Sequence, residues 1–217
     1  MKNKNKGFTL VELAIVMIII GLLTGGVIKG QELILNARLK STMKQLGSFK
    51  TAYHGFTDLF GYIPGDFPNA HARIAGCVNP YCYDGNGNRV IGPRINIWES
   101  PSQSRTTENQ QFWEHLALAN FIGGITTHST AVNFGESHPV SPMGGGFTVA
   151  SARSSGVATS QGIWVRLHGS LVSNVELHPV ISPRATGLID RKMDDGQPGT
   201  GDVQAFQYGN PGAGETG

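Results

Sequence analysis

The chain has few charged residues and no marked excess of either sign. Charged side chains make up 15% of its 217 residues, with 17 basic against 15 acidic residues and a net charge of +2. A typical globular domain carries about 25% charged residues. Proteins that bind nucleic acid generally concentrate a strong basic excess on one face. The composition therefore argues against a general nucleic-acid binder, and no specific nucleic-acid partner is evident.

Common catalytic patterns are also missing from the sequence. The seven histidines are dispersed and form no H-E-x-x-H motif, and there is no G-x-S-x-G sequence. The glycine run at 144–146 precedes a predicted strand, whereas a phosphate-binding loop would precede a helix. We therefore predict that the protein is not an enzyme. An anchored hydrolase would need a cluster of catalytic residues that the sequence does not indicate.

Cysteine is scarce, with two residues, Cys77 and Cys82, in the stretch CVNPYC. A structural zinc site needs four ligands, and only His71 lies close in sequence as a third. Such a pair stays reduced in the cytosol, whereas in an oxidising compartment it can close a short loop. We expect a disulfide between Cys77 and Cys82 if this part of the chain lies outside the cytoplasm.

The N-terminal segment determines the expected compartment. Residues 8–28 form an apolar run that follows three lysines, and about 20 such residues can span a membrane as a helix. Lysines before the run favour a cytoplasmic N-terminus, which places the following chain outside the cytoplasm. An ordinary signal peptide fits poorly, because its apolar stretch has about 7–15 residues and ends at an A-x-A-like site. We predict a single-pass membrane protein whose C-terminal domain lies outside the cytoplasm.

Glu12 is the one formal charge within the apolar run. A carboxylate at membrane depth costs a few kcal/mol and usually has a partner and a function. A cut between Gly7 and Phe8 would give Phe8 an α-amino group, largely protonated at neutral pH, one helical turn from Glu12. The two charges could pair within one chain or between neighbouring chains, and pairing between chains would fix their register. A plain anchor would need no carboxylate.

The stretch KGFTLVEL at 6–13 resembles the processing site of type IV prepilins and pseudopilins. The resemblance implies that prepilin peptidase cuts between Gly7 and Phe8 and methylates the amino group of Phe8. It also implies an assembly role for Phe8 and Glu12. The location that it implies is the bacterial inner membrane, with a periplasmic C-terminal domain, and an extracellular or periplasmic filament after assembly. The implied partners are other pilins, in a homo- or hetero-oligomer, an inner-membrane assembly platform, and membrane lipid before assembly.

The periodicity beyond the apolar run predicts that the helix continues to residue 60, before Pro64. Apolar residues recur there at steps of three or four, which is typical of one buried face. The helix thus has a transmembrane half and an amphipathic half. The residues of the apolar stripe are Leu35, Leu39, Met43, Leu46, Phe49, Tyr53, Phe56 and Phe60.

We predict an α+β, type IV pilin-like fold in which the long helix packs on a small antiparallel sheet. Its parts are a leader at 1–7, the helix at 8–60 (8–28 transmembrane or filament core) and an extracytoplasmic domain at 61–217. In that domain we expect a helix at 107–122, capped by Thr107, and a helix of one or two turns ending ISPRATGL. Strands are expected at 146–151, 162–169 and 175–181.

Four aspartates, Asp190, Asp194, Asp195 and Asp202, lie within a short C-terminal segment that resembles the D-x-K-x-D-D-G-x-P-x-x-G stretch of many pilin-like proteins. Calcium takes six to eight oxygen ligands, and major pseudopilins have a calcium site in a C-terminal loop. The alternative is an Asx-rich turn with solvated carboxylates. No cofactor is certain from the sequence, and calcium is left open.

The stretch DGNGN at 84–88 also resembles the first half of a calcium loop. It lacks the glutamate that would close an EF-hand loop, so a turn-rich loop is the favoured interpretation.

Together these patterns predict a filament subunit of a type IV pilus or pseudopilus, serving adhesion, motility, DNA uptake or type II secretion. The alternative is a membrane-anchored periplasmic binding module that does not polymerise.

Overall fold

The computed structural model describes residues 9–92, 106–151, 162–169, 171, 180–197 and 199–204. The chain divides into two compact units, residues 1–40 and 41–217. Helix α1, Leu10–Phe60, begins in the first unit and ends in the second. Its end agrees with the expected one before Pro64.

The described part of the first unit, residues 9–40, is the beginning of α1 and contains its apolar run. This is the one helix, within the described residues, whose length and composition suit a membrane span, with a mean hydropathy of 2.5 over its most apolar window. No side chain of that window is buried in the structure. Large apolar side chains are exposed on all sides of the helix. Such a surface needs lipid or other protein to cover it.

The second unit is built around the last part of α1, which buries one face. Phe49, Ala52 and Phe56 lie in the core, and Leu46 and Phe60 pack against it at its edge. This arrangement confirms residues 46–60 of the apolar stripe expected from Leu35 to Phe60. Leu39 is also buried, whereas Leu35 is exposed. The ring of Phe49 lies edge-on to Trp113 at a centroid distance of 4.9 Å.

Helix α3, Glu108–Leu118, supplies the opposite side of this core through Phe112, Trp113 and Leu116. Thr107 occupies the N-cap as expected, but its side chain makes no capping hydrogen bond. The helix ends earlier than the predicted residue 122.

The early end of α3 has a local cause in Asn120, which adopts a left-handed conformation with φ of 60°. The amide of Asn120 donates to Ala117 O, and that of Phe121 donates to Leu116 O, at 3.0 and 2.9 Å. These two bonds form a Schellman motif, which terminates a helix and satisfies its last carbonyls.

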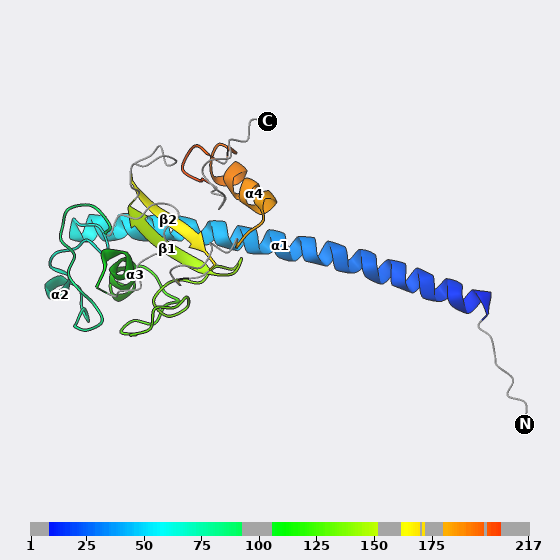
Figure 1. The fold of residues 1–217 in the computed structure, drawn as a ribbon, viewed down its shortest axis with the longest axis horizontal. Helices are drawn as coiled ribbons and strands as arrows, with labels where there is room; N and C mark the ends of the chain where they lie inside the picture. The colour runs from blue at the N-terminus through cyan, green and yellow to red at the C-terminus, as the bar shows by residue number, and fades with distance from the viewer. Residues whose placement is uncertain are drawn as a thin grey trace, which may run out of the picture. The chain divides into compact units, whose positions relative to one another are not determined.

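Strands β1, Gly146–Ser151, and β2, Ile163–His168, pair antiparallel, with Phe147 opposite Leu167 and Val149 opposite Val165. They lie side by side in Figure 1 next to the final part of α1. Phe147 and Val149 point into the core, where the ring of Phe147 lies 5.2 Å from that of Phe49. Both strands were predicted. Most of the third predicted strand, at 175–181, lies outside the described residues.

Two short helices complete the described part of this unit. Helix α2, Ala70–Arg73, places the Arg73 guanidinium over the rings of Phe60 and Phe67, and Arg73 also donates to Phe60 O at 3.2 Å. The last turn of α1 contains no basic residue. The guanidinium of Arg73 therefore supplies the positive charge that stabilises a helix C-terminus.

Helix α4, Pro183–Met193, begins at the N-cap Ser182, whose hydroxyl accepts from the Ala185 amide. It has 11 residues and is therefore longer than the one or two turns expected. The sequence Ser-Pro at its start is a recognised N-terminal signal that would have indicated its beginning. A long helix with a small antiparallel sheet and further helices confirms the predicted α+β, pilin-like class.

We expect Phe56→Ala to destabilise the second unit strongly, since Phe56 is fully buried (0% exposed). Truncating a buried phenylalanine typically costs about 3–5 kcal/mol. The matched control is Leu59→Ala on the same helix, where the side chain is 61% exposed and the expected cost is below about 0.5 kcal/mol. Denaturant unfolding of the full chain in detergent, followed by tryptophan fluorescence, measures both. Equal losses of unfolding free energy in the two variants would contradict the assigned core.

Candidate functional site

The first turn of α1 is held by Glu12 and Thr9. The Thr9 amide and hydroxyl each donate to Glu12 Oε2 at 2.8 Å, and the Glu12 amide donates to Thr9 Oγ1 at 3.3 Å. This reciprocal pair is a capping box, in which two otherwise unpaired amides at a helix start are satisfied. The sequence analysis missed Thr9, although the pattern T-x-x-E is its known signal.

Glu12 therefore has a local structural role in addition to its charge. The sequence contains no basic residue between Thr9 and Ile28. The next cation along α1 is Lys29, which lies about 25 Å further along the helix and pairs with Glu32 at 3.1 Å. The predicted processing residues Gly7 and Phe8 lie outside the described residues.

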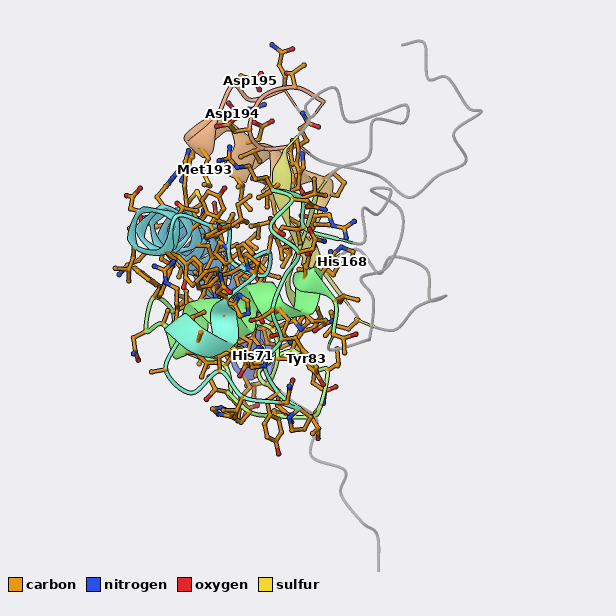
Figure 2. All side chains as sticks on the ribbon, turned by 90° about the vertical axis from the view of Figure 1, so that its left-hand side faces the viewer. His71, Tyr83, His168, Met193, Asp194 and Asp195 are labelled. Atoms are coloured by element: carbon orange, nitrogen blue, oxygen red, sulfur yellow. A yellow bond between two sulfur atoms is a disulfide. The ribbon has the colours of Figure 1, made fainter. Side chains whose placement is uncertain are left out.

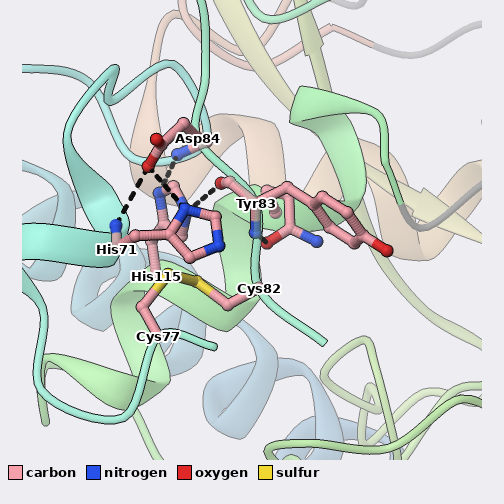
Figure 3. Close-up of polar contacts among 8 residues, drawn as sticks. His71, Cys77, Cys82, Tyr83, Asp84 and His115 are labelled. Atoms are coloured by element: carbon pink, nitrogen blue, oxygen red, sulfur yellow. Dashed lines mark hydrogen bonds and ion pairs between the residues drawn. A yellow bond between two sulfur atoms is a disulfide. The ribbon is translucent and has the colours of Figure 1, made fainter. Parts of the chain in front are cut away.

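The predicted cysteine pair lies in the second unit, where Cys77 and Cys82 are joined by a disulfide and buried in the core. The His115 ring lies next to the disulfide (Figure 3). Its Nδ1 accepts from the Gly65 amide and its Nε2 donates to Tyr83 O, both at 3.0 Å. Burial lowers the pKa of His115 to about 4, so the imidazole is neutral and both nitrogens are occupied. This arrangement holds the loop in place and is not a metal site.

The DGNGN segment uses its side chains to organise itself. Asp84 accepts from the amide of His71 and contacts its Nδ1, both at 2.9 Å (Figure 3). Asn86 and Asn88 each accept from an amide two residues further on, which is the geometry of an Asx turn. The structure thus agrees with the turn-rich interpretation of this loop rather than with a calcium loop.

The C-terminal acidic segment brings three of its four candidate ligands together. Oxygen atoms of Asp190, Asp194 and Asp195 lie within 4.8 Å of one another, whereas Asp202 is exposed and outside this group. Asp190 comes from the last turn of α4, and Asp194 and Asp195 follow directly after the helix (Figure 2).

Backbone amides shape this acidic loop. Asp190 Oδ1 accepts from Gly196 at 3.1 Å, and Asp194 Oδ2 accepts from Val203 at 2.9 Å. Gly196 and Gly201 have φ values of 79° and 73°, in the left-handed region that favours glycine. A Cβ at Gly201 would also overlap the carboxylate of Asp194. These contacts give a physical reason for the two glycines of the D-x-K-x-D-D-G-x-P-x-x-G stretch.

The electrostatics of the loop favour a cation. Asp190 is 1% exposed, and its Oδ2 has no hydrogen-bond partner. A hydrogen bond from the Thr200 hydroxyl, at 2.7 Å, holds the pKa of Asp195 below its usual range. A buried oxygen without a partner beside other carboxylates is costly unless a cation or a proton compensates it.

We expect breaking the Cys77–Cys82 disulfide to lower the stability of the second unit. Cross-linking a loop of this size stabilises by roughly 2 kcal/mol in the chain-entropy account. The measurement compares denaturant unfolding of the oxidised full chain with that of the same chain reduced by dithiothreitol. Reduction breaks the S–S bond and replaces no side chain. A Cys77→Ala/Cys82→Ala variant that does not respond to dithiothreitol is the control. Identical unfolding of both redox forms would contradict this role.

Residues 2–28 match the prokaryotic N-terminal methylation motif. This match covers the leader, the processing site and the apolar run, and it does not extend into the second unit. No curated protein matches the chain significantly, and neither does any solved structure. The motif implies cleavage by prepilin peptidase and assembly with other pilins. Residues 2–28 thus carry the signature of type IV pilins and pseudopilins, and they indicate a type IV pilin-like protein that is processed as a prepilin.

Proposed function

We propose that the protein is a structural subunit of a type IV pilus or pseudopilus. Prepilin peptidase removes the leader between Gly7 and Phe8 and methylates Phe8, and subunits then polymerise through the first part of α1. This proposal rests on the methylation motif, which lies on a helix with exposed apolar side chains. The apolar run of that helix contains one carboxylate, Glu12.

The exposed apolar surface of α1 supports two successive environments. In the inner membrane, lipid covers it, with the N-terminus in the cytoplasm and the C-terminal domain in the periplasm. An assembly platform then moves the subunit into a filament, where neighbouring helices replace the lipid. The buried Cys77–Cys82 disulfide is consistent with an oxidising compartment.

Glu12 forms an ion pair when subunits meet. Its capping contact with Thr9 satisfies one of its oxygens within the chain, yet the negative charge has no cation in the apolar run. The α-amino group of a processed Phe8 on a neighbouring subunit would supply that cation. Such a pair, removed from water, fixes the axial register of the helices.

We further propose that the loop of Asp190, Asp194 and Asp195 binds a calcium ion. The buried Asp190 Oδ2 without a partner and the close approach of three carboxylates support this proposal. Carboxylate and carbonyl oxygens are the ligands that calcium prefers. Asp202 would join them only if its exposed side chain turned toward the ion. Calcium would stabilise the loop that follows α4.

Replacing Glu12 separates its charge from its capping role. Glu12→Gln keeps the capping box, since glutamine can serve at this position, but removes the charge. Thr9→Val keeps the charge and removes the capping hydroxyl. We expect Glu12→Gln to abolish filaments, because losing one partner of a buried ion pair costs about 3–5 kcal/mol, whereas Thr9→Val retains them. Electron microscopy and sheared-filament yield measure assembly, and membrane fractionation checks insertion.

Normal filament yield from Glu12→Gln would contradict the pairing role. Intact mass of the membrane-recovered protein tests the wider proposal. A chain beginning at methylated Phe8 supports it, whereas a chain that still begins at Met1 would favour an anchored periplasmic binding module that does not polymerise.

The calcium proposal predicts saturable binding of Ca²⁺ to the chelator-treated full chain, with a dissociation constant of about 10⁻⁴–10⁻³ M, as in extracellular modules. Asp190→Asn should weaken binding by about tenfold or more, because ligand charge tunes calcium affinity. The control is Asp58→Asn, an exposed residue of α1 with the same loss of charge. Isothermal titration calorimetry measures all three proteins. Equal Ca²⁺ affinity in all three proteins would contradict the assignment of the calcium site.

A further inference from the structure

A groove in the second unit lies between α1 and the segment at 140–142. The Gln45 side chain joins its two sides, because Nε2 donates to Val140 O at 2.9 Å. The groove has a volume of about 440 Å³, which is in the range of ordinary binding pockets. None of its residues belongs to the predicted assembly, disulfide or calcium sites. The lining residues are Ser41, Lys44, Gln45, Ser48, Val140, Ser141 and Pro142.

One cation and one exposed apolar side chain determine what the groove can accept. Lys44 is exposed, and it forms no ion pair with any residue that the structure describes. Val140 is 49% exposed on the opposite side of the groove. An ammonium group attracts a carboxylate, and exposed apolar surface gains from contact with another apolar group. The groove therefore fits a partner that presents a carboxylate next to an apolar side chain.

The last turn of α1 presents that combination. The carboxylate of Asp58 is exposed, and among the described residues it has neither a hydrogen bond nor an ion pair. Leu59 follows it directly and is 61% exposed. Because the two residues are adjacent, one partner molecule can place both in the groove at once. The end of α1 is thus complementary to the groove in charge and in polarity.

The two surfaces of a single copy cannot meet. Residues 44 and 58 are 14 positions apart on one continuous helix, which corresponds to about 21 Å at 1.5 Å per residue. The groove can therefore receive the end of α1 only from another copy. A contact that joins two different surfaces of the same chain is heterologous, and each added copy leaves a free surface for the next one. Such contacts generate rings or open filaments rather than closed dimers.

We propose that the groove at residues 41–48 and 140–142 receives Asp58 and Leu59 of a second copy of this chain. The Asp58 carboxylate pairs with the Lys44 ammonium, and Leu59 packs against Val140. The inference rests on the proposed function as a filament subunit. It adds a contact in the second unit, which the methylation motif does not reach. The ion pair lies at an exposed site, so it contributes to the choice of register more than to affinity.

Cysteine cross-linking of the full chain, in cells that assemble the filament, tests which surfaces meet. Ser48→Cys and Leu59→Cys are combined in one chain and exposed to a mild oxidant. We expect a ladder of covalent oligomers, because each copy offers one cysteine to the copy on either side. The matched control is Ser48→Cys with His54→Cys, where the second cysteine replaces an exposed residue of α1 outside the groove. Cross-linking that stops at dimers, or that equals the control, would overturn the proposed contact.

Charge reversal tests the ion pair independently. Lys44→Asp and Asp58→Lys should each lower the yield of sheared filaments by about fivefold or more, because each places like charges at the contact. The double variant restores opposite charges and should recover the yield to within about twofold. Lys50→Asp, the same reversal on an exposed residue of α1 outside the groove, is the control. Immunoblots of the membrane fraction correct each yield for the amount of subunit. A loss that the double variant does not repair would contradict the pairing.

The unaltered chain separates this inference from the proposed function. If that chain is cut before Phe8 and forms filaments, but neither the cross-linking nor the charge reversals have the expected effect, the contact is wrong and the proposed function stands. If the unaltered chain forms no filaments, the proposed function fails and the contact fails with it.

Discussion

The apolar surface of the first part of α1 is the constraint on which the rest of the molecule depends. Its side chains are exposed on every side, and the described residues of its compact unit, 9–40, form no hydrophobic core of their own. Water is a poor solvent for such a surface, so this part of the helix needs lipid or other protein to cover it. Glu12 adds a second requirement, since its charge has no cation in the apolar run. In the proposed filament subunit, this one helix would set both the membrane location of the protein and its assembly.

The last part of α1 meets a different constraint. Its apolar residues occupy one face, and Trp113 of α3 and Phe147 of β1 pack against Phe49 on that face. A single helix can therefore serve two environments because its sequence changes from apolar all round to apolar on one side. Within the described residues the sheet has two strands, and the helix supplies the surface on which β1 packs.

Many acidic side chains among the described residues bind backbone amides. Glu12 binds the start of its own helix, Asp66 and Glu108 bind the loop at 84–92, and Asp190 and Asp194 bind the loop after α4. A chain with few charges has few ion pairs available. Backbone amides in left-handed turns are effective hydrogen-bond donors to anions. At the end of α4 the buried Asp190 also lies close to Asp194 and Asp195. A bound cation there would offset the repulsion among the three carboxylates.

The sequence by itself determined the processing motif, the long helix, its change of character, α3 and the two described strands. These features depend on runs, periodicity and short motifs, which are local. It also contained the capping box of Thr9 and the helix-ending Asn120, which local rules could have identified. Only the tertiary structure decided that Asp66 and Glu108 both bind backbone amides of the loop at 84–92. Such contacts join segments whose approach depends on how the whole unit packs, so no local pattern encodes them.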